Sequence, residues 1–527
     1  MEKEFNITGT CIPNMHYMVD ITSKLSDTIN LINKGKYFII NRPRQYGKTT
    51  TLYLLNKQLK NNEEYLPIKI SFEGIGDVVF EDEESFSKTF LKIISKNLSL
   101  KDEKLSLFLD EERDTVKDLS DLSSVITKLI TKADKKVVIM IDEVDKSSNN
   151  QLFLSFLGML RNKYLLRNEG EDITFHSVIL AGVHDIKSLK LRIRPDDDHK
   201  YNSPWNIASD FDVDMSFSVD EIGTMLDDYV QNKGVNLDKS YFSEKLYFYT
   251  SGYPFLVSKL CKIIDEKIMI ETKLKWEEAY MDMAVKLLLT ESNTNFDSLI
   301  KNIENNKELK ELVKKIILDG YEITYNQDNF IITIAIMYGI FKNNAGKVKI
   351  HNRIYEQRIY NYMSSLIETA SNLGFYNERA KFINANGDLN IKKILIKFKE
   401  FMKHEYSERR EAFLEDDGRL VFLAFISPII NGTGFAFKEV KGGDEKRFDI
   451  VITYNKNMYI IELKIWRGEE YHKKGLIQLG EYLEQYSLSE GYLLIFDFRK
   501  TENVSGEMSV IDVEVSGNSK EITEVYC

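Results

Sequence analysis

The stretch with the clearest chemical pattern is residues 447–465, RFDIVITYNKNMYIIELKI, which is typical of a β-hairpin with two carboxylates and a lysine on one face. Asp449 lies on the first strand and Glu462 on the second. Lys464 points the same way as Glu462, because side chains alternate between the two faces of a strand. Adjacent carboxylates repel each other unless a divalent cation lies between them, and their oxygens suit Mg²⁺. A lysine beside such an ion can position water or stabilise charge that develops on a phosphate.

The register of this hairpin decides whether the three groups meet. A two-residue turn at Asn455 and the following lysine pairs Thr453 with Met458. Counting outward from that pair places Asp449 opposite Glu462. A surface hairpin with a solvated charged face is the alternative for any isolated E-x-K strand. The paired aspartate, the apolar run YIIELKI and the helical segment after it favour a functional site.

This arrangement resembles the PD-(D/E)XK nuclease superfamily, with the first half written FD in place of PD. Gln478 and Tyr482, in KKGLIQLGEYLEQY, resemble the Q-x-x-x-Y helix motif of some members of that superfamily. The resemblance implies that these two residues support the site or contact the nucleic acid.

The same resemblance implies the roles of the three hairpin residues. Asp449 and Glu462 are expected to hold Mg²⁺, and Lys464 is expected to assist attack on a nucleic-acid phosphodiester. Members of the superfamily often carry a further helical acid, and here the sequence leaves Glu411 and Glu415 as alternatives.

A second chemical pattern lies at residues 37–55, YFIINRPRQYGKTTTLYLL, which predicts a strand, a tight loop and a helix. Loop amides and a helix N-terminus bind phosphate, a lysine reaches the β- and γ-phosphates, and a hydroxyl binds Mg²⁺. The usual pattern has a glycine five residues before Gly47. This chain has Arg42 there, so the loop departs from the pattern. The residues expected to bind ATP are Arg44, Gln45, Tyr46, Gly47, Lys48, Thr49 and Thr50, with Thr49 also a Mg²⁺ ligand.

The segment KKVVIMIDEVD supports this interpretation. Residues 137–141 form a short apolar run of the kind that a buried parallel strand needs, and it ends in Asp142 and Glu143. By its resemblance to P-loop NTPases, Asp142 is expected to hold Mg²⁺ through water and Glu143 to activate the attacking water. Further apolar runs separated by helical segments predict a parallel sheet with helices on both faces, and these runs are 66–72, 176–182 and 212–217.

Gly252 and Pro254 stand at the start of a predicted helix in SGYPFLVSKLCKIIDEK. By local rules this is an ordinary turn with a proline in the first helical position. Placed after an ATPase core, it resembles the lid motif of STAND-type and related AAA-like ATPases, which implies that Pro254 lies beside the nucleotide. Residues 203–211 also resemble a segment of bacterial AAA-ATPase-like proteins that carry a C-terminal PD-(D/E)XK domain, and the chain is similar to that family over nearly its whole length.

The predicted fold class is α/β, with a P-loop parallel-sheet ATPase core, a helical lid and a winged-helix-like module, followed by an α/β PD-(D/E)XK nuclease-like domain. Helical patterns fill the lid segment, and helix alternating with strand is typical of a winged helix. Asn-Gly and Gly-Asp turns mark the end of the linker. The expected domains are 1–217 (core), 218–290 (lid), 291–365 (winged-helix-like module), 366–390 (linker) and 391–527 (nuclease-like domain).

Composition predicts a cytoplasmic enzyme. The chain has 527 residues, of which 43% are apolar, and this is enough to bury several cores. Its three cysteines are odd in number and widely spaced, which indicates neither a disulfide framework nor a zinc site. No apolar run is long enough to span a bilayer, and the first residues show no signal-peptide pattern, so no membrane partner is expected.

The net charge of −11 is unfavourable for binding nucleic acid, although the local distribution of charge matters more than the total. A basic stripe on a predicted helix just before the nuclease-like segment is a candidate contact with the nucleic-acid backbone. A solvated helix face is the alternative. The residues of this stripe are Lys392, Lys399, Lys403 and Arg410.

The sequence therefore predicts an ATP-binding and ATP-hydrolysing protein with a Mg²⁺-dependent nuclease domain. Its expected partner is nucleic acid, with DNA favoured over RNA, and formation of a homo-oligomer is left open. The alternative is a nucleotide-dependent switch or scaffold that binds nucleic acid or protein without cleaving it.

Overall fold

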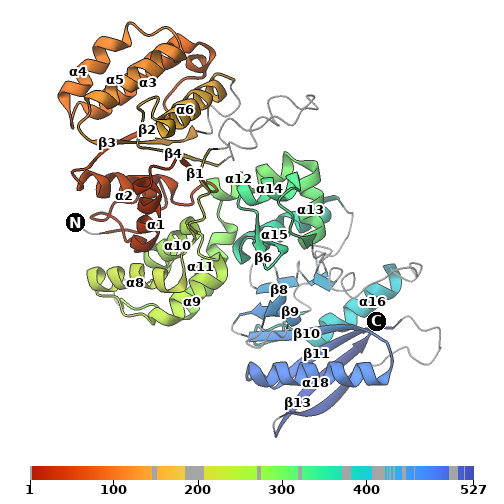
Figure 1. Ribbon diagram of the computed structural model, residues 1–527. Helices are drawn as coiled ribbons and strands as arrows, with labels where there is room; N and C mark the ends of the chain where they lie inside the picture. The colour runs from red at the N-terminus through yellow and green to blue at the C-terminus, as the bar shows by residue number, and fades with distance from the viewer. Residues whose placement is uncertain are drawn as a thin grey trace. The chain divides into compact units, whose positions relative to one another are not determined.

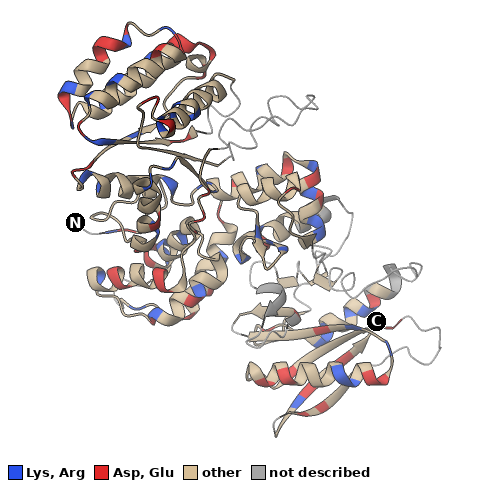
Figure 2. Cartoon of the chain, in the orientation of Figure 1, with Lys and Arg blue, Asp and Glu red and all other residues tan. Residues whose placement is uncertain are grey.

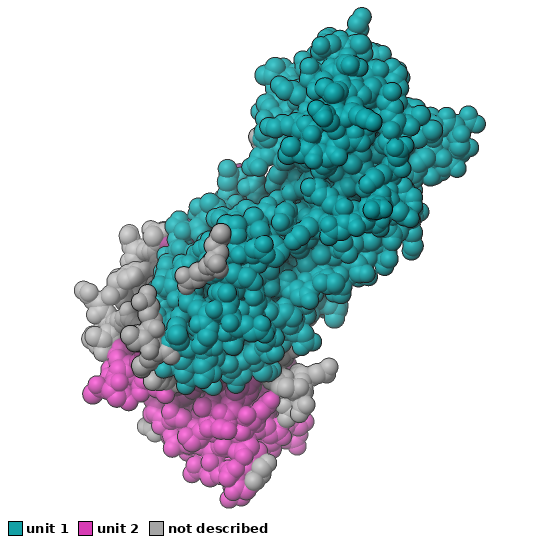
Figure 3. Space-filling model, turned by 90° about the vertical axis from the view of Figure 1, so that its left-hand side faces the viewer, with its two compact units in different colours: residues 1–306, 324–355 teal, residues 307–323, 356–527 magenta. Residues whose placement is uncertain are grey.

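The structure, a computed structural model, describes most of the chain as helices and strands (Figure 1). The described residues are 3–144, 151–183, 207–269, 274–317, 323–370, 382–405, 422–423, 425–426, 429–430, 434–441, 447–455, 457–497, 508–515 and 517–527. They divide into two compact units, coloured separately in Figure 3. Unit 1 comprises residues 1–306 and 324–355, and unit 2 comprises residues 307–323 and 356–527.

The core of unit 1 is a four-stranded parallel sheet with the strand order β1-β4-β3-β2. The strands are β1 (Phe38–Asn41), β2 (Tyr65–Ser71), β3 (Lys136–Asp142) and β4 (Ser177–Gly182). Every residue of β4 and all but the first residue of β3 are buried, as expected for parallel strands covered on both faces. The strands predicted at 66–72 and 176–182 are therefore confirmed.

Helices cover both faces of this sheet (Figure 1). One face is packed against α3, α5 and α6, which share a large apolar cluster with the strands, and α1 and α2 lie on the other side. Figure 2 marks the acidic and basic residues along these helices. The helices are α1 (Thr22–Asn33), α2 (Lys48–Lys60), α3 (Glu83–Leu98), α4 (Glu103–Arg113), α5 (Leu119–Lys132) and α6 (Gln151–Glu169), with a 3-10 helix at Asp77–Glu81.

The strand predicted at 212–217 is wrong. Among the described residues, the segment that leads to α8 pairs with β1 only through an isolated bridge between Phe38 and Ser209. The physical reason lies in Arg42, whose guanidinium donates to the carbonyls of Phe211 and Val213 at 3.2 and 2.8 Å. These carbonyls are thus satisfied by a side chain and not by a neighbouring strand.

The helices predicted over 218–290 are present. They are α8 (Val219–Lys233), α9 (Lys239–Thr250), α10 (Pro254–Ile263) with a π-helical turn at Ile264–Ile268, and α11 (Ala279–Thr290). Gly252 joins α9 to α10 with φ +72°, and a Cβ there would lie 2.0 Å from the carbonyl oxygen of Phe217. Only glycine fits this close approach of two backbones.

Helices and a small three-stranded sheet follow, which is the alternation predicted for 291–365. The elements are α12 (Thr294–Glu304), α13 (Lys307–Ile317), β5 (Ile323–Thr324), α14 (Phe330–Met337), β6 (Phe341–Asn344), β7 (Lys347–Ile350) and α15 (Arg353–Ala370), with the sheet order β5-β7-β6. The first residues of the predicted linker 366–390 form the last turn of α15. Near the other end of the linker the chain makes a turn at Gly387.

Unit 2 contains a six-stranded mixed sheet with the order β12-β13-β11-β10-β9-β8. Helix α18 (Glu469–Gln485) packs on one face through a cluster that includes Ile460, Leu479 and Leu493. Helix α16 (Ile391–Glu405) lies against the other face, where Phe398 meets Phe496 at 6.5 Å between ring centroids. The strands are β8 (Gly434–Lys441), β9 (Arg447–Tyr454), β10 (Asn457–Ile465), β11 (Glu490–Phe496), β12 (Ser509–Val515) and β13 (Asn518–Tyr526).

Candidate functional site

The predicted phosphate loop connects β1 to α2 in unit 1. Gly47 caps the helix with φ +81°, a conformation that glycine adopts without strain, and Lys48 begins the helix. The Lys48 side chain is buried, and its Nζ donates to the carbonyls of Arg42 and Pro43 at 2.8 and 2.9 Å. The ammonium group therefore lies inside the curve of the loop, where an incoming phosphate would meet it.

Arg42, which stands where the usual pattern has glycine, ties the loop to the segment that leads to α8. Besides its bonds to the carbonyls at 211 and 213, its guanidinium lies 5.4 Å from the centre of the Phe211 ring. Burial lowers the pKa of the Arg42 guanidinium. The departure from the usual glycine thus adds a fixed anchor to this loop.

Asp142 ends β3 at the same edge of the sheet as the phosphate loop, because β1, β4 and β3 are parallel. It is 3% exposed, and its carboxylate accepts the backbone N–H of Glu143 at 3.0 Å. Glu143 has φ +54°, an uncommon conformation for a residue with a side chain.

A cavity of about 340 Å³ adjoins the loop. The phosphate loop contributes Gln45 to Gly47, Thr50 and Thr51, and the helical segment contributes Pro254, Phe255 and Ser258. The N-terminal segment between Asn6 and Ile21 supplies much of the remaining wall. Within this segment, the backbone N–H of Cys11 donates to the Thr50 hydroxyl at 3.0 Å.

The contribution of the N-terminal segment to the cavity wall was not predicted from the sequence. The segment NITGTCIPNMHYMVD has no spacing that marks a binding site, and its contacts with the loop join residues far apart in the chain. Pro254 is buried in the cavity wall, in the first position of α10. Arg44 is exposed and does not line the cavity.

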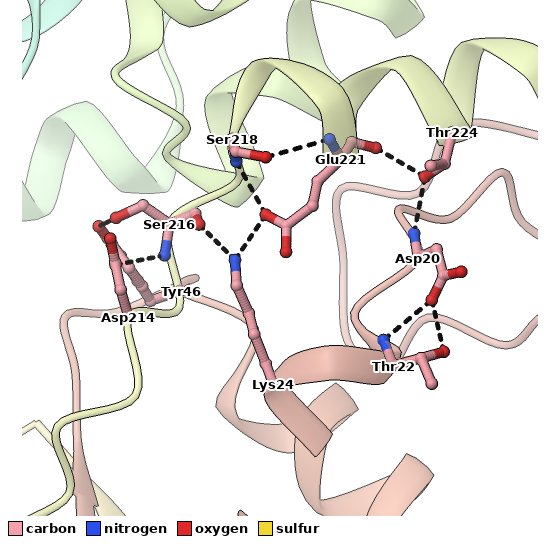
Figure 4. Close-up of polar contacts among 9 residues, drawn as sticks. All are labelled: Asp20, Thr22, Lys24, Tyr46, Asp214, Ser216, Ser218, Glu221 and Thr224. Carbon is pink, nitrogen blue, oxygen red and sulfur yellow. Dashed lines mark hydrogen bonds and ion pairs between the residues drawn. The ribbon is translucent and has the colours of Figure 1, made fainter. Parts of the chain in front are cut away.

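The start of α8 is tied to the core by several polar contacts (Figure 4). Lys24 of α1 donates to Glu221 at 2.6 Å and to the Ser216 carbonyl at 2.5 Å. The Ser216 hydroxyl in turn lies 2.8 Å from the Tyr46 hydroxyl of the phosphate loop. Ser218 and Glu221 form a capping box that fixes the first turn of α8.

The phosphate loop also contacts residues of unit 1 within 291–306 and 324–355. The Tyr46 hydroxyl lies 3.0 Å from His351 Nε2, and burial lowers the pKa of His351 to about 3, so this imidazole is neutral. The Tyr253 hydroxyl donates to the Arg44 carbonyl at 2.6 Å. Asn295 donates to the Gln45 side chain at 2.9 Å.

The same interface includes a backbone approach that requires glycine. Gly339 has φ +72°, and a Cβ there would lie 2.9 Å from the Pro43 ring. The Tyr355 hydroxyl donates to Asn295 at 2.8 Å, which extends the hydrogen-bonded chain away from the loop. Movement of the loop would therefore have to rearrange a buried polar network.

The second candidate site lies in unit 2 on the hairpin β9–β10. The observed pairs Thr453↔Met458 and Ile450↔Ile461 confirm the predicted register, and Asp449 and Glu462 are the next residues along the two strands. Asn455 takes φ +54° in the turn, while Lys456 lies outside the described residues. The Asp449 carboxylate accepts the backbone N–H of Leu463 at 2.9 Å, which fixes it against β10.

Glu462 is the most constrained acid of this site. It is 1% exposed, Lys464 Nζ lies 2.9 Å from its Oε1, and its Oε2 is buried with no hydrogen-bond partner among the described residues. Burial, together with the charge of Asp449, raises the pKa of Glu462 to about 7. A buried carboxylate oxygen without a partner, next to a second carboxylate, is a fitting ligand set for a hard divalent cation.

Helix α18 covers this site. Gln478 donates to the Tyr482 hydroxyl. Burial raises the pKa of Tyr482, and the nearby charges of Glu462, Lys464 and Asp449 also affect this pKa. A Cβ at Gly475 would lie 3.7 Å from the Lys464 side chain, so the lysine stem lies along the helix. Among the described residues no group of three or more His, Cys, Asp and Glu side chains gathers as a metal site, and Glu411 and Glu415 lie outside that part of the chain.

The predicted basic stripe lies on α16, against the sheet face opposite α18. Its apolar side is buried as predicted through Ile394, Phe398 and Met402. Lys392 is paired with Glu521 of β13 at 2.9 Å, which removes one cation from the stripe. Lys399 is half-buried, the Lys403 side chain is not described, and Arg410 lies outside the described residues.

A family model described as an AAA-like domain matches residues 16–361. The chain is also similar to three solved structures, each at 12% sequence identity. They are a Walker-type ATPase of Pyrococcus abyssi (covering 67% of this chain and 99% of that chain, TM-score 0.47) and the ORC2 protein of Aeropyrum pernix (covering 69% of this chain and 97% of that chain, TM-score 0.40). The third is the RuvB Holliday junction branch migration motor of Thermotoga maritima (covering 65% of this chain and 95% of that chain, TM-score 0.33). A comparison with the curated proteins found no match. In the described part of the chain, no helix combines the length and apolar character needed to cross a bilayer.

Proposed function

The chain belongs to the AAA-like domain family, and we propose that it couples an ATPase site in unit 1 to a Mg²⁺-dependent nuclease site in unit 2. The family supports an AAA-type ATPase. The nuclease, its metal and its nucleic-acid substrate are part of this proposal, with DNA favoured over RNA.

For the ATPase, the arrangement of the phosphate loop supports binding of ATP. Lys48 is expected to leave its two loop carbonyls and contact the β- and γ-phosphates, and the backbone amides at the start of α2 face the same anion. The cavity between the N-terminal segment and Pro254 offers an apolar wall for the base. Thr49 and Asp142 are the expected Mg²⁺ ligands, and Glu143, one residue further, is expected to orient water.

For the nuclease, the unpartnered buried oxygen of Glu462 is the observation that carries the proposal. Asp449 and Glu462 would hold Mg²⁺, which when bound polarises the phosphate and lowers the pKa of a water ligand. Lys464, now paired with Glu462, is placed to bind a phosphate oxygen or the attacking water. Tyr482 and Gln478 are expected to support the helix side of the site or to contact the nucleic acid.

A plasmid-nicking assay with Mg²⁺, with and without ATP, tests the proposal. Asp449→Asn and Glu462→Gln should each abolish nicking while the thermal unfolding midpoint stays at or above that of the wild type, because each change keeps the shape and removes a charge. Full activity in either purified variant would refute the metal-site assignment.

A second candidate function is a nucleotide-dependent switch that binds a partner without cleaving it. The contacts of Tyr46 with His351 and of Gln45 with Asn295 favour it, because they connect the phosphate loop to residues outside the ATPase core. ATP-dependent changes in partner binding, with no nicking under any condition, would support this candidate over the nuclease.

A further inference from the structure

Unit 2 contains a buried carboxylate that the proposed chemistry does not use. Glu524 of β13 is 2% exposed, its Oε1 is bonded to His472 Nε2, and its Oε2 accepts from the Ser509 hydroxyl at 3.1 Å. A carboxylate this far from water needs a compensating partner, and His472 is the ionisable side chain in contact with it.

The strand register places Glu524 on the same sheet face as the proposed metal ligands. Glu462 pairs with Leu493 across β10 and β11, and Leu493 pairs with Glu524 across β11 and β13. Residues paired in register share a face, so the two glutamates lie in one row, about 10 Å apart at two strand spacings. Helix α18 packs over this face and carries His472.

On α18, His472 lies near the position that contacts Lys464 of β10. Gly475, which faces the Lys464 side chain, comes three residues after His472, so the two positions share a helix face about one turn apart. The imidazole also packs near Trp466 and Tyr526, with ring centroids at 5.3 and 6.4 Å. These rings fix its orientation at the end of β10.

The second ring nitrogen of His472, Nδ1, is the atom that a ligand could contact. The side chain keeps 16% of its surface exposed, and no described residue hydrogen-bonds to Nδ1. When both nitrogens carry a proton, Nε2 donates to Glu524 and Nδ1 is left as a charged donor. Such a donor is suited to a phosphate oxygen.

We propose that His472, oriented by Glu524, binds a backbone phosphate of the nucleic acid next to the one held at Asp449, Glu462 and Lys464. This proposal rests on the proposed nuclease function and adds a phosphate subsite to it. A purely structural clamp is less favoured, because Leu476, Leu479 and Leu483 already pack α18 onto the sheet without the cost of a buried charge.

The test measures binding of a fluorescent 20-base-pair DNA duplex to protein that carries Glu462→Gln, so that the duplex is not cleaved. Adding His472→Gln should weaken binding about ten-fold, as expected for loss of one charge-assisted contact. It should also lower the slope of log Kd against log salt by about 1, a change that a structural role would not produce. His472→Arg, which keeps a cation, should retain most of the affinity.

Ser509→Ala is the matched control, because it removes the other partner of Glu524 and leaves His472 in place. It should leave affinity and salt slope unchanged. Equal affinity and slope for His472→Gln and its parent would overturn the phosphate subsite, as would a parent that binds no duplex. A wild type that binds the duplex but does not cleave it with Mg²⁺ would refute the nuclease alone.

Discussion

Tyr46 in the phosphate loop and His351, which is 305 residues later in the chain, share a hydrogen bond of 3.0 Å in the interior of unit 1. The Tyr46 side chain is 4% exposed, and burial raises its pKa to about 12, so its hydroxyl stays protonated. The hydroxyl can donate one hydrogen bond and accept others, which allows it to serve both His351 and Ser216.

Tyr46→Phe tests how much this link stabilises unit 1. The change keeps the ring and leaves the buried His351 nitrogen without its partner, so the free energy of unfolding should fall by about 1–3 kcal/mol. Ser216→Ala removes one of the two bonds of Tyr46 and should cost less. Urea unfolding of both variants measures the difference, and a Tyr46→Phe protein as stable as the wild type would contradict a structural role for the link.

Arg42→Gly restores the usual glycine and should harm this protein. The variant loses the guanidinium bonds to the carbonyls of Phe211 and Val213, and unpaired buried carbonyls should lower the free energy of unfolding by at least about 2 kcal/mol. Because Phe211 and Val213 line the cavity, ATP affinity should fall as well. Arg44→Gly, at an exposed neighbour in the same loop, is the control, and equal behaviour of the two variants would show that the anchor is dispensable.

Lys48→Ala and Glu143→Gln should separate ATP binding from hydrolysis. Loss of the charged contact at Lys48 should weaken ATP binding at least about ten-fold. Glu143→Gln should bind ATP as the wild type does and release phosphate much more slowly, because the water loses its activating carboxylate. Calorimetry measures the first effect and phosphate release the second. Wild-type affinity in Lys48→Ala would refute the phosphate cradle.

The raised pKa of Glu462 predicts that the free energy of unfolding depends on pH when no metal is present. Its pKa of about 7 in the folded protein lies above the ordinary value of 4.5, so the folded state binds a proton more tightly than the unfolded state. Stability should therefore be highest at and below pH 4.5, as far as this group is concerned, and decline as the pH rises to 7. The loss from this one group is about 3 kcal/mol at most.

Glu462→Gln should remove that decline. In EDTA at pH 8 the variant should be more stable than the wild type, and near pH 4.5 the two should be alike. Adding Mg²⁺ at pH 8 should stabilise the wild type and not the variant, because metal binding replaces the missing partner of Oε2. Chemical unfolding at the two pH values, with and without Mg²⁺, measures these effects. A wild type that Mg²⁺ does not stabilise would count against the metal site.

Coupling between the two sites is expected to run through the helical segment that carries Pro254. ATP can shift a conformational equilibrium only if it binds the two states with different affinity. Glu143→Gln should hold the ATP-bound state and change DNA cleavage in an ATP-dependent way, whereas Pro254→Ala should weaken that response and leave the metal site intact. Cleavage rates that are the same with no nucleotide, ATP and ADP in all three proteins would show that the units are only tethered.

Local patterns were enough to predict several parts of this structure. Alternation of side chains and a two-residue turn set the register that places Asp449 beside Glu462, and the apolar run before Asp142 predicted β3. The strand at 212–217 was predicted wrongly, because its apolar pattern does not reveal that Arg42 binds the carbonyl of Val213, together with that of Phe211 just before the segment.

Contacts between distant segments could not be predicted in the same way. The cavity wall formed by the N-terminal segment and the ion pair of Lys392 with Glu521 depend on tertiary packing, and nothing in the neighbouring sequence marks them. The hydrogen bond between Glu524 and His472 could not be predicted for the same reason, since the two residues lie 52 positions apart on different elements.

The tight turn of the β9–β10 hairpin makes the length of the chain there as critical as its composition. Asn455 holds the left-handed conformation of this turn, and Glu462 lies four residues beyond the pair that Met458 forms with Thr453, about 13 Å along the strand. One inserted residue that shifted this pairing would turn Glu462 to the opposite face of the sheet, away from Asp449. Insertions and deletions at residues 455–457 should therefore be tolerated far less than substitutions, and a scan of single-residue insertions would map this constraint directly.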